Sequence, residues 1–166
     1  MAIRAITHLT LISPTAIEAL EHPVFWSLEK RLDFLCCVGD EMDKLCDMEN
    51  TSPDLQAFVA ALRAESKKTN LMNGDWRQNV HEAVASNYER GIISLLRCIR
   101  NTQRHRETSP DVLRSVGRTP AEVASYFLHR FPQLLIVVWR TVLKHIDSLV
   151  KLQRFFPAKS ATQVGH

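Results

Sequence analysis

Apolar residues recur every three or four positions along residues 24–48, and this is the period of an amphipathic helix. Comparable helical patterns follow through the chain, and no alternating strand pattern occurs outside an ambiguous first dozen residues. At 166 residues the chain is long enough to bury its own core. We therefore predict an all-α fold, a single compact helical domain. The apolar positions of this first long helix are Phe25, Leu28, Leu32, Leu35, Val38, Met42 and Leu45.

Hydroxyl–proline pairs mark the beginnings of several predicted helices. Ser13, Ser52 and Thr119 each precede a proline, which places a capping oxygen before the first helical residue. Thr119 and Glu122 also have the spacing of a capping box. Besides the helices that start at these caps, we expect a loop at residues 67–76, a helix over 76–86, a break at 88–91 and a helix over 92–105. The buried stripe of the last of these is Ile92, Leu95, Leu96 and Ile99. A short helix or turn then ends at Gly117, and a last long helix starts near Phe131-Pro132 and continues over 133–152.

Composition limits the possible functions. The cysteines form no Cys-x-x-Cys pair, so we expect reduced thiols in a cytoplasmic protein rather than a zinc site or a disulfide framework. No apolar run is long enough to span a membrane, and the N-terminus lacks the features of a signal peptide. Glycine-rich phosphate loops, HExxH and GxSxG are absent, which argues against nucleotide cofactors and the common hydrolases. The cysteines are Cys36, Cys37, Cys46 and Cys98.

Charge divides the sequence into two unequal parts. Residues 1–96 hold nine Lys and Arg and fourteen Asp and Glu, whereas residues 97–166 hold twelve and four. The second part therefore carries a balance of +8, against −5 for the first. A basic half of this kind suits a polyanionic partner, although a solvated basic helix face gives the same pattern.

One pattern in the basic half suits a chemical step. Asn101 and His105 are four residues apart, hence on one helix face, and Arg100 lies one step around the helix. An imidazole, whose intrinsic pKa is near 6.5, can donate or accept a proton at neutral pH, and a guanidinium can stabilise charge on a phosphate. These groups fit metal-free RNA cleavage, but a basic helix end carries the same residue types by chance. Arg97, Arg104 and Arg106 add positive charge around the pattern.

Four stretches of the chain carry a resemblance to a known family. They are "EHPVFWSLEKRLDFL" (21–35), "GDWRQN" (74–79), "SLLRCIRNTQRH" (94–105) and "SYFLHRFPQLLIVVWRTV" (125–142). In this order they resemble the kinase-extension nuclease (KEN) domain of the inositol-requiring, unfolded-protein-response kinase/ribonucleases and of ribonuclease L. The resemblance covers about residues 14–156. It implies that residues 1–20 correspond to the last helix of a kinase C-lobe and that 21–157 form a KEN-type ribonuclease domain. The terminal position of residues 158–166 predicts a flexible tail.

The resemblance implies a metal-independent endoribonuclease that leaves 2′,3′-cyclic phosphate and 5′-hydroxyl ends. His105 then matches the general acid, and Asn101 and Arg100 match ligands of the phosphate and the transition state. Tyr88 matches the family's catalytic tyrosine, a proposed general base, with a packing residue at a helix end as the alternative. The substrate-binding candidates are Arg97 and Arg104, beside the pattern, and Arg106, Arg114 and Arg118, in the family's RNA-contacting helix–loop element; solvated surface charge remains the alternative for the last three.

The chain departs from the family in one respect that bears on its partners. No kinase lysine, catalytic loop or DFG motif is present, so we expect no ATP and no other cofactor. We expect RNA, as a stem-loop or single-stranded loop, and a homodimer or a heterodimer with a full-length relative. Two alternatives of another class stay open: a non-catalytic dimerisation or RNA-binding module that regulates a full-length relative, and a helical adaptor without RNA affinity.

Overall fold

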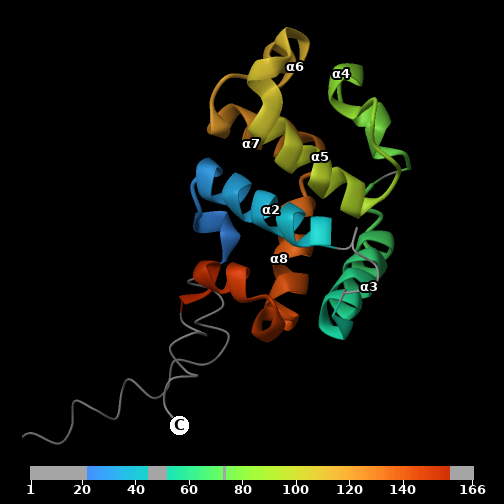
Figure 1. The fold of residues 1–166 in the computed structure, drawn as a ribbon, viewed down its shortest axis with the longest axis vertical. Helices are drawn as coiled ribbons and strands as arrows, with labels where there is room; N and C mark the ends of the chain where they lie inside the picture. Colours follow the sequence, from blue (N-terminus) through green and yellow to red (C-terminus); the bar gives the residue numbers. More distant parts are fainter. Residues whose placement is uncertain (1–21, 45–51, 73, 158–166) are drawn as a thin grey trace, which may run out of the picture.

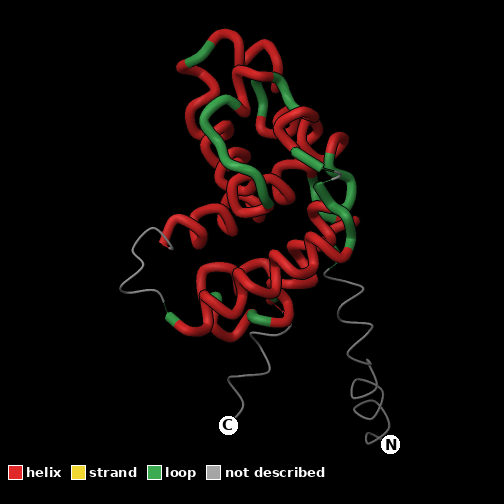
Figure 2. Tube along the Cα trace, turned by 90° about the vertical axis from the view of Figure 1, so that its right-hand side faces the viewer, coloured by secondary structure: helices red, strands yellow, loops and turns green. Residues whose placement is uncertain are grey.

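The computed structural model describes residues 22–44, 52–72 and 74–157, and this part of the chain is helix and loop without a strand (Figures 1 and 2). The predicted all-α fold is therefore confirmed. The predicted kinase-like segment at residues 1–20 and the predicted tail at 158–166 lie outside the described residues. The α-helices are α2 (Leu28–Asp43), α3 (Pro53–Lys68), α4 (Glu82–Ala85), α5 (Ile92–His105), α6 (Pro110–Val116), α7 (Pro120–Arg130) and α8 (Leu134–Lys144). The 3-10 helices are η2 (Pro23–Phe25), η5 (Trp76–Asn79), η6 (Arg106–Thr108), η7 (Ile146–Ser148) and η8 (Val150–Phe155).

Capping side chains begin the helices where the sequence predicts them. The Ser52 hydroxyl accepts a hydrogen bond from the Leu55 amide at the start of α3. Thr119 and Glu122 form the predicted capping box of α7, each accepting from the other's backbone amide. Gly117 ends α6 with a φ of 95°, a conformation that glycine adopts without a steric cost. These local signals are confirmed, and the predicted cap at Ser13 lies outside the described residues.

The first long helix begins later than its apolar period predicts. Ser27 caps α2, and the preceding residues form the short turn η2. The Arg31 guanidinium holds this turn in place by donating to the carbonyls of Val24 (2.8 Å) and Trp26 (3.0 Å). The Trp26 ring packs edge-on against Phe34 at a centroid distance of 5.3 Å. Trp26 is therefore a core residue that follows a turn, whereas Phe25, predicted to lie on the apolar face of the helix, is exposed in that turn.

Two other predicted helices are broken in the structure. The expected helix over residues 76–86 is divided into η5 and α4, because Val80 is extended and the His81 ring caps α4 by accepting from the Ala83 amide. The expected helix over 133–152 ends as an α-helix at Lys144 and continues as η7 and η8. Its buried residues there recur every third position, which is the period of a 3-10 helix rather than of an α-helix. They are Ile146, Leu149, Leu152 and Phe155.

The contact between α2 and α5 lies at the centre of the molecule (Figure 1). Gly39 allows the two helices to approach closely, because a Cβ at this position would lie 2.9 Å from the Leu96 carbonyl oxygen and 3.0 Å from the Arg100 Cβ. Leu95, Leu96 and Ile99, all predicted to be buried, have no exposed surface. None of the helices among the described residues has both the length and the apolar character needed to cross a membrane.

The Gly39→Ala variant tests this close approach. Alanine normally stabilises a helix relative to glycine, but here its methyl group meets a backbone oxygen that cannot move without separating α2 from α5. We expect the free energy of unfolding to fall by about 1–3 kcal/mol, measured by urea denaturation. An unchanged or increased free energy of unfolding would show that the two helices have room to adjust.

Candidate active site

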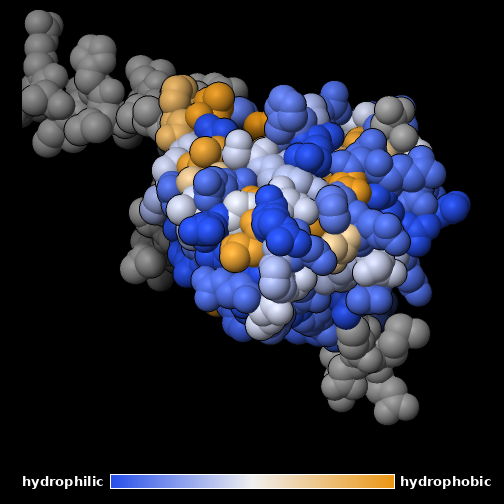
Figure 3. All heavy atoms as spheres, turned by 90° about the horizontal axis from the view of Figure 1, so that it is seen from above, coloured by the Kyte–Doolittle hydropathy of each residue, from blue (hydrophilic) through white to orange (hydrophobic). Residues whose placement is uncertain are grey.

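A hollow of about 330 Å³ opens where α4, the end of α5, η6 and α6 meet. Its apolar lining residues include Val84 and Val112, and its polar lining residues include Tyr88, Asn101 and His105. The α4 and α6 end of the molecule is uppermost in Figure 1, and Figure 3 shows that face as mainly hydrophilic with separated apolar spots. A hollow of this size and lining can take a polar group the size of a nucleotide.

The structure brings three of the four predicted catalytic residues together at this hollow. Asn101 and His105 lie on one face of α5, and Tyr88 reaches them from the loop that precedes the helix. The Asn101 amide nitrogen donates to the Tyr88 hydroxyl oxygen at 2.8 Å. The His105 side chain is exposed at the last residue of α5, where a substrate can reach it.

Burial sets the chemistry of the Tyr88 phenol. The ring is half-buried beside Trp76, at a centroid distance of 6.2 Å, and burial raises the pKa of the Tyr88 hydroxyl above its ordinary value. The hydrogen bond from Asn101 opposes this shift without cancelling it. At neutral pH the phenol therefore keeps its proton, and it can donate that hydrogen while its oxygen accepts from Asn101.

Arg100 lies on a different face of α5. It is one residue from Asn101, hence about 100° around the helix, and its guanidinium is buried against two carboxylates of α2. It pairs with Asp40 at 3.3 Å and also with Asp43. In this chain Arg100 does not line the hollow with His105.

Two predicted substrate-binding arginines pair with the same two carboxylates as Arg100. Arg97 pairs with Asp43 at 3.0 Å, and Arg104 pairs with Asp40 at 2.9 Å. We call the five residues Asp40, Asp43, Arg97, Arg100 and Arg104 the α2–α5 ion-pair ladder. The acidic side of α2 thus pairs with the arginines on one face of α5.

The remaining predicted arginines differ in their surroundings. Arg106 is buried, and its guanidinium donates to the carbonyls of Arg118 (3.0 Å) and Gln103 (2.6 Å), so it ties the loop after α6 to the end of α5. Arg114 is exposed and pairs with Asp111 on its own helix, and Arg118 is exposed. Arg114 and Arg118 are therefore accessible to a ligand, whereas the Arg106 donors are already used within the chain.

The sequence reasoning did not identify the turn η5 as part of the site. Its Arg77 donates to the Tyr88 carbonyl, and its Trp76 donates to the Glu89 carbonyl. The available signal was the stretch "GDWRQN", whose tryptophan and arginine are too far from Tyr88 in sequence to suggest a contact. Only the folded chain shows that this turn supports the loop that carries the tyrosine.

Comparison with known proteins identifies a matching family model and several relatives of the chain. The family model described as Ribonuclease 2-5A matches residues 31–156. The chain is 33% identical over 153 residues to the serine/threonine-protein kinase/endoribonuclease IRE1a of Arabidopsis thaliana, which covers 87% of this chain and 17% of that protein. It is 33% identical over 134 residues to the kinase/endoribonuclease ire-1 of Caenorhabditis elegans, covering 76% of this chain and 13% of that protein.

A human protein is also similar to this chain. The kinase/endoribonuclease IRE2 of Homo sapiens is 28% identical over 137 residues, covering 78% of this chain and 14% of that protein. The chain thus spans less than a fifth of the length of these relatives. The match to the family model includes Tyr88, Asn101 and His105, the three residues that meet at the hollow. The all-α chain described here therefore belongs to the Ribonuclease 2-5A family, the KEN-domain family that its motifs resemble.

Proposed function

We propose that this chain is a metal-independent endoribonuclease that cleaves RNA through its own 2′-hydroxyl group. The observation that carries the proposal is the convergence of Tyr88, Asn101 and His105 on one solvent-open hollow. The names of the relatives, which are kinase/endoribonucleases, support the same activity. A cytoplasmic location stays a prediction of the cysteine pattern.

The three side chains fit distinct parts of the reaction. The 2′-oxygen forms a bond to phosphorus as the bond from phosphorus to the 5′-oxygen breaks, and the 2′-hydroxyl proton leaves to solvent. His105, as imidazolium, donates the proton that the departing 5′-oxygen needs. Tyr88 and Asn101 supply hydrogen-bond donors to the phosphate oxygens, which gain negative charge in the transition state. The products are a 2′,3′-cyclic phosphate and a 5′-hydroxyl.

The neutral phenol gives Tyr88 a different role from the one that the resemblance suggests. A raised pKa makes Tyr88 a poor proton acceptor at neutral pH, so we assign it to orientation of the phosphate rather than to general base catalysis. The exposed arginines among the predicted substrate-binding residues are Arg104, Arg114 and Arg118, and each phosphate contact adds to the salt dependence of binding.

One observation favours a second candidate function. The α2–α5 ion-pair ladder holds Arg100, the family's expected phosphate ligand, on the α2 side of α5. A chain with Arg100 in this place suits a non-catalytic module that pairs with a full-length relative. Cleavage by the purified chain alone separates the two functions, because only the endoribonuclease acts without a relative.

The first prediction concerns cleavage and His105. A hairpin RNA incubated with the purified chain in EDTA should give fragments with 2′,3′-cyclic phosphate and 5′-hydroxyl ends, identified by mass spectrometry. The His105→Ala variant should lose about a hundredfold or more in cleavage rate, because no other group at the hollow donates a proton so readily. The control is His129, an exposed histidine on α7, and the His129→Ala variant should cleave like the wild type. Equal rates for the two variants would remove His105 from the mechanism.

The second prediction concerns the ionisation of Tyr88. The chain has two tyrosines, so the difference in tyrosinate absorbance between the wild type and Tyr88→Phe isolates Tyr88. We expect its midpoint above the ordinary value of 10.0. Because the phenol keeps its proton to a higher pH in the folded state than in the unfolded state, the contribution of Tyr88 to the free energy of unfolding should be lost as pH rises above about 10. A midpoint at or below 10 would contradict the neutral phenol.

The third prediction concerns assembly. We propose that the active form is a homodimer, as the family resemblance implies. Analytical ultracentrifugation should show a mass that rises from 19.0 kDa toward twice this value with increasing concentration. Cleavage rate per chain should rise over the same range. A chain that cleaves at full rate as a monomer would remove dimerisation from the proposal.

A further inference from the structure

The loop that carries Tyr88 is held at two consecutive carbonyl groups by the turn η5. Arg77 Nη1 donates to the Tyr88 carbonyl oxygen at 3.2 Å, and Trp76 Nε1 donates to the Glu89 carbonyl oxygen at 3.2 Å. Trp76 has no exposed surface, so the turn is anchored in the core. The peptide group between Tyr88 and Glu89 is therefore fixed in orientation, although the loop itself has no regular secondary structure.

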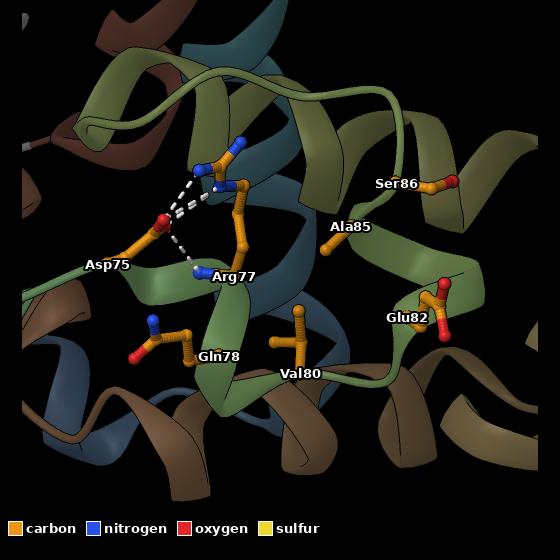
Figure 4. Close-up of a pocket in the computed structure, with 7 residues that line it drawn as sticks. All are labelled: Asp75, Arg77, Gln78, Val80, Glu82, Ala85 and Ser86. Carbon is orange, nitrogen blue, oxygen red and sulfur yellow. Dashed lines mark hydrogen bonds and ion pairs between the residues drawn. The ribbon is translucent and has the colours of Figure 1, made fainter.

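Asp75 in turn fixes the Arg77 side chain (Figure 4). Arg77 Nε lies 2.9 Å from Asp75 Oδ1, and Nη2 lies 2.5 Å from Oδ2, which is a forked pairing of guanidinium and carboxylate. This pairing leaves Nη1 for the Tyr88 carbonyl. A lysine ammonium at position 77 cannot hold both partners in this planar geometry.

The pairing persists at neutral pH and lies close to the candidate active site. Only 10% of the Asp75 side chain is exposed, and the hydrogen bonds from Arg77 hold the pKa of its carboxyl well below the usual range. The carboxylate therefore stays charged until the solution becomes strongly acidic. Arg77 also lines a hollow of about 370 Å³ that shares Ser86 with the Tyr88 hollow, so the two hollows adjoin at this residue.

We propose that Asp75 and Arg77 are positioning residues for RNA cleavage, because they fix the Tyr88 peptide and so direct the Tyr88 phenol toward Asn101 and the phosphate. The inference rests on the proposed function for its effect on cleavage. Nothing else among the described residues holds the Tyr88 carbonyl, and the phenol must reach Asn101 across thirteen positions of sequence. Hydrogen bonds weaken steeply away from their preferred geometry, so a shift of the Tyr88 backbone weakens the bond between its hydroxyl and Asn101.

Cleavage kinetics test whether Arg77 acts through Tyr88. Arg77→Met should lower kcat by about tenfold with little change in KM, because orientation of the phosphate matters most in the transition state. In a Tyr88→Phe background the same change should lower kcat by less than about twofold. Arg77→Lys should behave like Arg77→Met, since it keeps the charge and loses the fork. Effects of Arg77→Met and Tyr88→Phe that simply multiply would overturn the proposal.

Arg90→Met is the matched control. Arg90 also pairs with Asp75, at 3.1 Å, but its side chain is 76% exposed and no hydrogen bond joins its guanidinium to the Tyr88 carbonyl. It should keep the wild-type kcat. An equal loss in Arg90→Met and Arg77→Met would trace the effect to the charge near Asp75 and would rule out positioning through the carbonyl.

An NMR measurement tests the positioning without any cleavage assay. With ¹³C at the ring Cζ of tyrosine, the chain gives two resonances, and Tyr126 serves as the internal reference. The Tyr88 resonance should move in Arg77→Met and in Asp75→Asn toward its position in Asn101→Ala, while the Tyr126 resonance stays in place. A Tyr88 resonance that does not move in folded Arg77→Met would overturn the proposal.

The two measurements keep the positioning inference apart from the proposed function. If the wild type cleaves no RNA, the proposed function fails, whereas a shifted Tyr88 resonance still supports control of the phenol by Asp75 and Arg77. If the wild type cleaves RNA and Arg77→Met cleaves equally well, the positioning inference alone fails. Thermal melting of each variant identifies loss of fold, and Asp75→Asn supplies a second variant that keeps the size and shape of the side chain.

Discussion

The close contact of α2 with α5 is the constraint on which the candidate site depends. Gly39 brings the helices together, and the ion-pair ladder then fixes the rotation of α5 about its own axis. A guanidinium as buried as that of Arg100 requires its carboxylate partners, since removing them leaves a charge without compensation. With one face of α5 fixed against α2, Asn101 and His105 must face the hollow. The same helix contact therefore determines both the packing of the core and the direction of the candidate catalytic side chains.

The loop before α5 obtains its shape from another part of the chain. It contains no helix or strand, yet its carbonyls are hydrogen-bonded to the side chains of η5, and Gly91 turns it into α5 with a φ of 106°. The Tyr88 phenol completes the arrangement by meeting Asn101. The hollow thus combines a rigid helix face with a loop whose order comes from side-chain donors, and loops supported in this way commonly carry functional residues.

The sequence predicted those features that local chemistry determines. Capping residues, the buried stripe of α5 and the break before it depend on neighbours within a few positions, and the structure confirms each of them. The all-α fold and the family membership are confirmed as well.

The sequence did not predict the turn at η2 or the 3-10 helices after Lys144, because tertiary contacts decide between two helical periods. The place of Arg100 was also missed, because its partners on α2 lie about sixty residues away in sequence. The roles of the site residues stay predictions.

The ion-pair ladder also changes how the charge of the sequence should be understood. The basic half has a balance of +8, but three of its arginines are matched by two carboxylates from the acidic half. Arginines paired within the fold are less available to neutralise phosphates, so under the proposed function RNA binding should release fewer counterions than the composition suggests. The chain should therefore attract polyanions in general only weakly. Under the proposed function, discrimination among RNA molecules then depends on the shape of the hollow rather than on long-range attraction.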